Sequence, residues 1–198
     1  MLEAQGMMTE FDITESRVRV FCLCVCFAAL TGLGAWLRIP ILPVPVTLQV
    51  FFVLLSGLAL GPRLGAASQL LYISAGLCGL PVFAAFPHAG PAVLLGPTGG
   101  YLLGFPVAAG ITGWVGERLG GRNGNGTWAC VAACGCGLLA IYSFGAGWLA
   151  VWLQMHDKSA LQAFSLGIKP FILVDSLKAL AAAGIGVATG LRFSRMFR

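Results

Sequence analysis

Six apolar stretches divide the chain, and the segments between them are short and either polar or rich in proline and glycine. Of the 198 residues, 58% are hydrophobic and only 10% are charged, whereas soluble domains are about 25% charged. A bilayer core requires roughly 20 helical residues, or about 17 for the shortest spans, so two stretches need flanking residues to cross it. We therefore predict an all-α integral membrane protein, a bundle of six transmembrane helices. The stretches are Val18–Leu37, Val46–Leu60, Leu64–Leu80, Gly99–Val115, Thr127–Leu153 and Pro170–Leu191.

The basic residues are distributed unevenly between the two sides that six spans define. Cytoplasmic connections of membrane proteins carry an excess of lysine and arginine, so the richer side is predicted to be cytoplasmic, and both termini lie there. The net charge of +5 then reflects topology in the cell membrane, and no nucleic-acid partner is expected. The inner side holds Arg17, Arg19, Arg63, Arg118, Arg122, Arg192, Arg195 and Arg198, and the outer side holds Arg38, Lys158 and Lys169.

The first sixteen residues differ from the rest of the chain because they are polar and carry several carboxylates, including Glu3, Glu10 and Asp12. A cleavable signal peptide starts with a basic segment and ends at a small-residue site, so we expect the first apolar stretch to be retained. We interpret residues 1–16 as a polar cytoplasmic tail and residues 17–198 as one transmembrane domain.

The motifs of several enzyme classes are missing from the sequence. It contains no G-x-x-x-x-G-K-[ST] phosphate-binding loop and no G-x-S-x-G nucleophile turn. The seven cysteines lie in apolar stretches, and no histidine or carboxylate stands nearby in sequence to complete a tetrahedral metal site. We therefore expect no catalytic residues, no metal and no catalytic cofactor.

Glycines recur at a spacing of four within the apolar stretches, at Gly57/Gly61, Gly100/Gly104 and Gly186/Gly190. In lipid, small residues at this spacing allow two helix backbones to approach closely, so we predict tightly packed helices. Ala28, Gly32 and Ala35 give the first helix a similar small face. That face either binds another membrane subunit or packs within the chain.

Four polar side chains are predicted to lie in the outer leaflet, namely Gln49, Tyr101, Asp175 and Lys178. Ionisable residues within a span are costly and usually mark a functional site. Asp175 and Lys178 share one helix face because they are three residues apart. Two interpretations stay open: the pair contacts a ligand from the outer side, or it is a mutual ion pair that only fixes packing. Pro170 suits a first helical turn, so the last helix is predicted to begin there.

Two outer connections are predicted to cover a pocket. Pro40–Thr47 contains three prolines, which fix φ, so we expect a stiff and largely extended arm. Residues 79–100 show little secondary-structure signal, and irregular backbone at membrane depth must be buried in protein or line a cavity. This connection ends in the sequence GPTGG, whose glycines let backbone N–H groups approach a ligand. A plain turn before a helix is the alternative interpretation.

At these motifs the sequence resembles the BioY family, the biotin-binding membrane subunits (S components) of energy-coupling-factor (ECF) vitamin transporters. The resemblance runs from about Phe27 to the last apolar stretch. It rests on several uncommon motifs in a fixed order, and their combination is specific. They are IP at Ile39, PVPVTLQ ending at Gln49, GPRLG from Gly61, GLPVF ending at Phe83, GPTGGYLLGFP from Gly96 and DSLK from Asp175 to Lys178.

The resemblance implies an S-component-like bundle that holds one biotin in an outward-facing pocket under the first outer connection. It also implies partners for uptake, namely a membrane coupling subunit and a pair of cytoplasmic ABC-type ATPases, although some family members are found without dedicated partners. The polar pair of the family corresponds to Asp175 and Lys178. The loop glycines of the family correspond to Gly96, Gly99 and Gly100, with Thr98 and Tyr101 beside them.

Biotin offers a planar ureido group, an apolar bicycle and a carboxylate on a flexible tail. Asp175 is suited to accept hydrogen bonds from the ureido N–H groups, and Lys178 to donate to the ureido oxygen or to stabilise Asp175. Arg38 is a candidate for the tail carboxylate. The aromatic candidates for the bicycle are Phe83, Tyr101, Trp148 and Trp152. The predicted substrate-binding set is Asp175, Lys178, Tyr101, Gln49, Thr98, Gly99, Gly96, Phe83 and Arg38.

The chain departs from the family pattern between Phe83 and Leu95, where AAFPHAGP replaces a glycine-rich run. We interpret His88 in this run as facing solvent rather than replacing a polar contact. Two other functions stay open. One is an S component for another vitamin, such as thiamine or riboflavin. The other is a small intramembrane enzyme that uses Asp175 and Lys178 as acid and base, although no nucleophile or metal set accompanies the pair.

Overall fold

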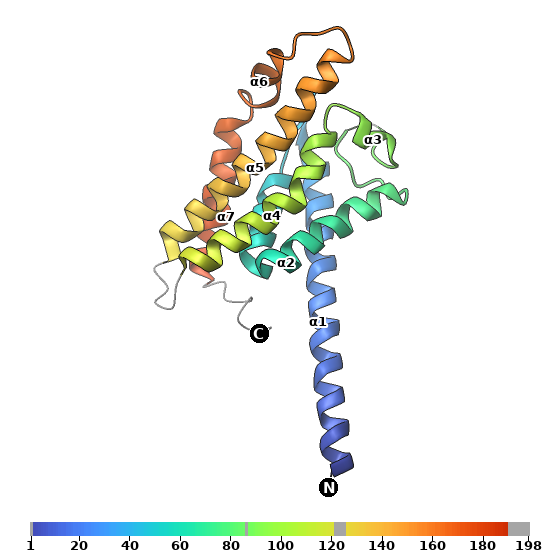
Figure 1. Ribbon diagram of the computed structural model, residues 1–198, viewed down its shortest axis with the longest axis vertical. Coiled ribbons are helices and arrows are strands. Elements are labelled where there is room, and N and C mark those ends of the chain that lie inside the picture. Colours follow the sequence, from blue (N-terminus) through green and yellow to red (C-terminus); the bar gives the residue numbers. More distant parts are fainter. Residues whose placement is uncertain (1, 86, 121–125, 190–198) are drawn as a thin grey trace.

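Helices that run back and forth between two ends make up most of the chain, and the computed structural model describes residues 2–85, 87–120 and 126–189 (Figure 1). This architecture confirms the prediction of a helical protein. The first helix also includes residues 2–16, the segment interpreted as a polar tail. The elements are α1 (Leu2–Trp36), β1 (Arg38–Ile39), β2 (Val46–Thr47), α2 (Gln49–Leu77), α3 (Ala92–Leu95), α4 (Gly99–Leu119), α5 (Gly126–Gln154), α6 (Gln162–Gly167) and α7 (Ile172–Ala188).

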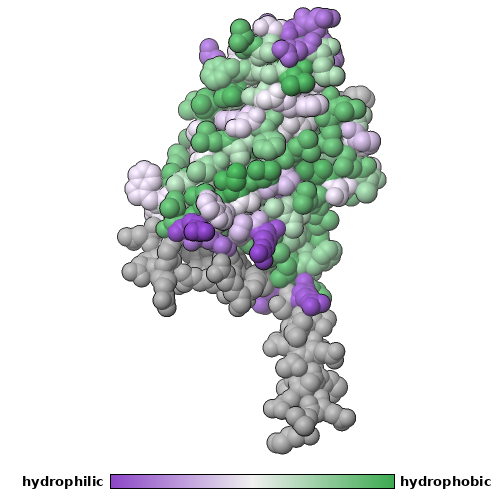
Figure 2. Space-filling model, in the orientation of Figure 1, coloured by the Kyte–Doolittle hydropathy of each residue, from purple (hydrophilic) through white to green (hydrophobic). Residues whose placement is uncertain are grey.

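Three helices in the described part of the chain are long and apolar enough to cross a membrane, at Arg17–Trp36, Gln49–Leu77 and Gly126–Gln154. Helix α4, with 21 residues, and helix α7, with 17 residues, pack beside them. Figure 2 shows a broad hydrophobic surface between two levels that carry hydrophilic residues. Large exposed apolar surfaces of this kind suit contact with lipid rather than water.

Helix α2 is sharply bent, and the bend accounts for two of the six apolar stretches. Gly61 has φ 78° and ψ −178°, a conformation that only glycine adopts readily, and Pro62 follows it without a backbone N–H to donate. The two arms fold back on each other, since the Gln69 amide donates to the Ser56 hydroxyl at 3.1 Å. The stretches Val46–Leu60 and Leu64–Leu80 thus correspond to the two arms of one bent helix.

Glycines bring α2, α4 and α5 into close contact, as their spacing predicts. A Cβ atom added to Gly57 in α2 would overlap the carbonyl oxygen of Ala109 in α4. One added to Gly104 in α4 would lie 3.0 Å from the Phe144 side chain of α5. Tight backbone approach of this kind maximises van der Waals contact where lipid gives no hydrophobic drive.

The small face of α1 packs within the chain. Ala35 has no exposed surface, and a Cβ atom added to Gly32 would lie 3.5 Å from the side chain of Val82. Of the two interpretations of this face, the structure therefore shows intramolecular packing.

The segment Pro40–Thr47, predicted to be a single extended arm, belongs to a hairpin. Strands β1 and β2 pair in antiparallel fashion, with Arg38 opposite Thr47 and Ile39 opposite Val46. The prolines lie in the turn between the two strands, where their missing N–H groups interrupt no ladder. The expectation of a continuous extended arm is wrong, because the chain reverses direction within ten residues.

The last helix begins two residues later than predicted. Helix α7 starts at Ile172, and Phe171 precedes it as the N-cap residue. Asp175 therefore lies in the first turn of α7, and Lys178 one turn further on. The start of α7 lies at the end of the bundle where α6 lies (Figure 1), and Lys178 reaches the hairpin there, because its Nζ donates to the carbonyl oxygen of Thr47.

Candidate ligand-binding site

An open cavity lies between the hairpin, the start of α2, the connection after α2 and the helices α4, α5 and α7, and its empty space of about 560 Å³ includes solvent at the mouth. Small-molecule pockets are mostly apolar with a few convergent polar groups, and the lining of this cavity has that composition. The polar lining consists of Thr47, Gln49, Thr98, Tyr101, Tyr142 and Asp175. The apolar lining consists of Val44, Pro45, Val50, Phe83, Ala84, Ala85, Val93, Leu102, Phe105, Ile141 and Phe171.

Asp175 is the one charged side chain of this lining among the residues that the structure describes, and it is only 4% exposed. Its Oδ1 accepts a hydrogen bond from Lys178 Nζ at 2.7 Å, and its Oδ2 accepts one from the Tyr142 hydroxyl at 3.0 Å. Its position in the first turn of α7 also places the carboxylate at the positive end of the helix dipole. A carboxylate offers about four acceptor positions, so Asp175 retains capacity for a donor in the cavity.

Lys178 lies behind Asp175 and does not itself line the cavity. Its Nζ donates to Asp175 and, at 2.6 Å, to the carbonyl oxygen of Thr47, so it ties α7 to the hairpin. The ion pair of the packing interpretation is therefore present. The ion pair is not enclosed on all sides by helices, because Asp175 also lines the cavity.

Gln49 is held at the cavity wall by a chain of hydrogen bonds. Its Oε1 accepts from the Thr47 hydroxyl at 3.1 Å, and its Nε2 donates to the Tyr72 hydroxyl at 2.6 Å. Tyr72 in turn donates to the carbonyl oxygen of Val82 at 3.1 Å. The network joins the hairpin to both arms of α2 and fixes the orientation of the Gln49 amide.

Tyr101 and Thr98 border the cavity from the start of α4, and their hydroxyl groups differ in their partners. The Tyr101 hydroxyl donates to the carbonyl oxygen of Gly167 at 2.7 Å. Thr98 is the N-cap residue of α4, but its Oγ1 makes no capping bond and is buried without a hydrogen-bond partner. An unpaired buried hydroxyl costs about 1–3 kcal/mol, so the Thr98 Oγ1 is available to a molecule in the cavity that Thr98 borders.

Two of the four aromatic candidates line the cavity. Phe83, which is 1% exposed, packs edge-on against Tyr72 with the ring centroids 5.7 Å apart, and Tyr101 also lines the cavity. Trp148 instead donates from its ring nitrogen to the carbonyl oxygen of Gly96 at 2.8 Å, and Trp152 stacks on His156. Neither tryptophan belongs to the lining.

Gly96 and Gly99, two further members of the predicted set, do not line the cavity. Gly96 accepts the bond from Trp148, and a Cβ atom added to Gly99 would overlap the backbone of Leu94. Both glycines therefore shape the turn between α3 and α4, which presents Thr98.

Arg38 lies at the rim of the cavity and joins the hairpin to the connection after α2. Its guanidinium donates to the carbonyl oxygen of Ala84, and one of its nitrogens lies 3.3 Å from Nδ1 of His88. His88 is half-buried, and its Nδ1 is 3.0 Å from the carbonyl oxygen of Phe83. The expectation that His88 only faces solvent is wrong, because the loop folds around its ring.

Sequence reasoning missed Tyr142 and Thr47. Tyr142 stands in an apolar helix, and nothing near it in sequence points to Asp175, which is 33 residues away. Its hydroxyl within an apolar span is a signal that could have found it, because such a group needs a buried partner. Thr47 takes part through its backbone carbonyl as well as its side chain, and the residue type alone does not reveal that role.

Comparison with known proteins places the chain among membrane transport proteins. The model of the BioY family matches residues 7–195. A probable biotin transporter BioY from Pyrococcus horikoshii is 46% identical over 156 residues, which cover 79% of this chain and 86% of that protein. The biotin transporter BioY from Thermotoga maritima is 42% identical over 162 residues, covering 81% and 89%. The names of these relatives describe transport rather than catalysis.

A solved structure has a similar fold. The crystal structure of the S-component for biotin from an ECF-type ABC transporter superposes with a TM-score of 0.81 at 25% sequence identity. The match covers 93% of this chain and 98% of that one. Fold and sequence therefore point to the same group of membrane proteins.

Proposed function

Because the chain belongs to the BioY family, we propose that it is a membrane-embedded subunit that binds biotin and mediates its uptake. The observation that carries the proposal is the cavity beside Asp175, an apolar chamber in which one carboxylate retains acceptor capacity. A chamber of this composition suits a ligand with a planar hydrogen-bonding head and an apolar body. Biotin has both features.

In the proposed complex, Asp175 accepts hydrogen bonds from the ureido N–H groups. Lys178 fixes Asp175 in place, because it donates to Oδ1 at 2.7 Å. Tyr142 holds the second oxygen at 3.0 Å and sets the plane of the carboxylate. Hydrogen bonds to a charged group contribute about 1.5–3 kcal/mol each, so a ligand without the ureido donors binds far more weakly.

Thr98 supplies the donor for the ureido oxygen in this arrangement. The hydroxyl groups of Thr47, Tyr101 and Tyr142 already donate to protein acceptors, whereas the Thr98 Oγ1 has no partner. Gln49 adds a polar contact on the neighbouring wall. The apolar bicycle then lies against the aromatic rings of Phe83 and Tyr101 and of Phe105, which also lines the cavity.

The remaining members of the predicted set support the site from outside it. Gly96 and Gly99 shape the turn that presents Thr98, and Arg38 holds the hairpin and the Ala84 loop together at the rim. Their role is to position the cavity walls.

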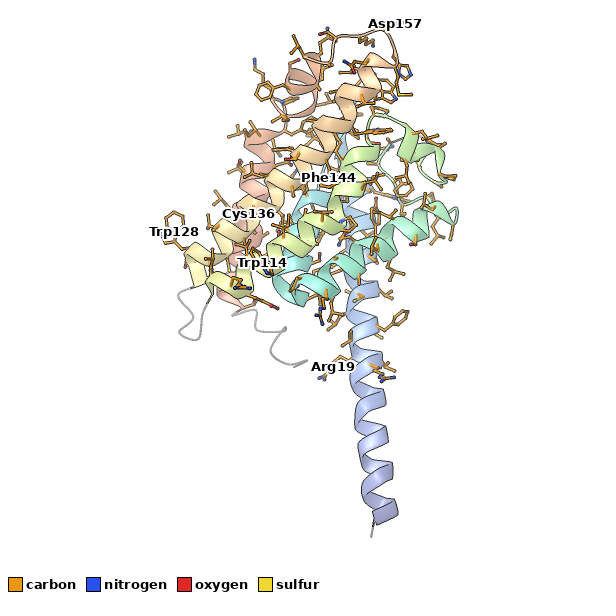
Figure 3. All side chains as sticks on the ribbon, viewed as in Figure 1. Arg19, Trp114, Trp128, Cys136, Phe144 and Asp157 are labelled. Carbon is orange, nitrogen blue, oxygen red and sulfur yellow. The ribbon has the colours of Figure 1, made fainter. Side chains whose placement is uncertain are left out.

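We place the chain in the cell membrane with six spans, both termini in the cytoplasm and the cavity open to the outside. Residues 17–198 form the transmembrane domain, and residues 1–16 extend from it as a polar tail. Arg19 and Trp114 lie toward one end of the bundle and Asp157 at the other (Figure 3). Arg118 covers the Trp114 ring at 5.4 Å, a basic and aromatic pair typical of a membrane interface.

Energy for uptake comes from partners in this proposal. The sequence has no phosphate-binding loop for ATP, and the similar solved structure belongs to a multi-subunit ECF-type transporter. A membrane coupling subunit and ABC-type ATPases therefore complete the transporter, and uptake by the chain alone is the alternative. Co-purification of the tagged chain with such subunits distinguishes the two.

Binding of radiolabelled biotin to the purified full-length chain tests the proposed function. We expect a dissociation constant below about 1 μM, together with biotin retained through purification and detected by mass spectrometry. Unlabelled thiamine and riboflavin, added in excess as competitors, are expected to leave the signal unchanged. Displacement by either vitamin instead assigns the cavity to that compound and refutes the proposal.

A further inference from the structure

We propose that the site recognises only the bicyclic head of biotin and leaves the tail carboxylate in water at the cavity mouth, so that the chain also binds carboxamides of biotin. The inference rests on the proposed function and names its substrate class. Neutral amides, such as the one formed with the side-chain amine of lysine, then fit as well as the free acid.

The charge of the lining disfavours a ligand carboxylate inside the cavity. Asp175 is its one charged side chain in the described part of the chain, and that charge is neutralised by Lys178. A ligand carboxylate inside the cavity would thus meet a negative group and no available cation. Burying an unpaired carboxylate costs several kcal/mol, so the tail group is more stable outside.

The two nearby cations, Lys178 and Arg38, are not lining residues. Lys178 lies behind the wall, where it donates to Asp175 and to the carbonyl oxygen of Thr47. Arg38 is exposed and donates to the carbonyl oxygen of Ala84. A carboxylate inside the cavity would therefore have neither cation beside it in the lining.

The mouth of the cavity lies between the hairpin and the connection after α2. Most of the lining is buried, and its three half-buried members are Pro45, Thr47 and Ala85. They belong to the hairpin and to the facing connection, so the opening lies between these two segments. Asp175 is on α7 and is only 4% exposed. For a ligand whose ureido group is held by this buried carboxylate, the opening is the route by which the tail reaches water.

The test compares biotin with biotinamide, in which a neutral amide replaces the carboxylate. Dissociation constants are measured by calorimetry on the full-length chain, with 2-iminobiotin, altered only in the ureido group, as a matched control. We expect biotinamide to bind within about fivefold of biotin, because an exposed charge contributes at most about 1 kcal/mol. A larger loss for biotinamide overturns the inference. Failure of biotin itself to bind refutes the proposed function instead.

The same comparison in the variant Arg38→Gln tests whether this arginine binds the tail carboxylate. We expect the ratio of the two dissociation constants, biotinamide over biotin, to match that of the unmodified chain within about fivefold. A structural effect of the substitution weakens the binding of both compounds equally and therefore leaves the ratio unchanged. A larger change in the ratio would assign the carboxylate to Arg38 and overturn the inference.

Discussion

Thr98 places a buried hydroxyl group without a protein partner at the cavity wall. A threonine at a helix N-cap normally accepts a hydrogen bond from the first turn, yet Thr98 Oγ1 makes none and is buried. The variant Thr98→Val keeps the shape and removes the hydroxyl. We expect biotin affinity to fall about tenfold, since a net hydrogen bond contributes about 1 kcal/mol or somewhat more.

Thermal unfolding of the ligand-free Thr98→Val variant separates a binding role from a structural one. Removing an unpaired buried hydroxyl relieves a desolvation cost, so the melting temperature is expected to stay equal or rise. Thr98→Ser retains the hydroxyl and is expected to bind within about threefold of the original chain. A lower melting temperature together with unchanged affinity would show that Thr98 only caps α4.

The sequence predicted much of this site at the level of single residues. Asp175, Gln49 and Tyr101 were identifiable because polar and charged groups within apolar spans are costly and usually mark a functional site. Thr98 and Phe83 were identifiable only through the family motifs, because their residue types are common in such chains. The contribution of Tyr142 depends on the packing of α5 against α7, and no local pattern encodes that contact.

At the scale of elements, glycine sets the distance between α2 and α4. A Cβ atom added to Gly113 would lie 2.5 Å from the Gly61 carbonyl carbon and the Pro62 nitrogen, so the two helices meet at the bend. The variant Gly113→Ala is expected to lower the melting temperature, because overpacking costs about 1–3 kcal/mol. Thermal unfolding in detergent, followed by fluorescence, measures the change.

Gly110→Ala is the matched control on the same helix. A Cβ atom there would lie 3.7 Å from the nearest heavy atom, an ordinary contact, so we expect no loss of stability. Equal melting temperatures for the two variants would contradict the claim that the bend of α2 requires a glycine opposite it.

Most helices were predictable from hydropathy, and the connections were not. Apolar length identified the stretches, but the bend at Gly61 and Pro62 that joins two of them into one helix was not predicted. The hairpin was missed because pairing of β1 with β2 depends on contacts with α1 and α7, which local sequence does not show.

At the scale of the whole molecule, the arrangement of charge predicts the orientation in the membrane. We expect green fluorescent protein fused to the C-terminus to fluoresce, because it folds in the cytoplasm. Alkaline phosphatase fused within the connection near Asp157 is expected to be active, because it folds outside. The opposite pattern for both reporters would reverse the topology and place the cavity on the cytoplasmic side.

The whole bundle also explains why lipid tolerates a charged pair in the last helix. Asp175 and Lys178 neutralise each other, and contacts with Tyr142 and Thr47 satisfy further bonding positions. What the protein leaves open is the side of Asp175 that borders the cavity. The account therefore depends on a ligand that binds to this carboxylate.

Calorimetric titration of biotin into the chain and into Asp175→Asn tests that claim most directly, with Asp157→Asn on the exposed outer connection as a matched control. We predict that Asp175→Asn weakens biotin binding by about 100-fold or more, because a buried charged acceptor is lost, while Asp157→Asn binds as the original chain does. Equal affinity of the two variants for biotin would contradict the account.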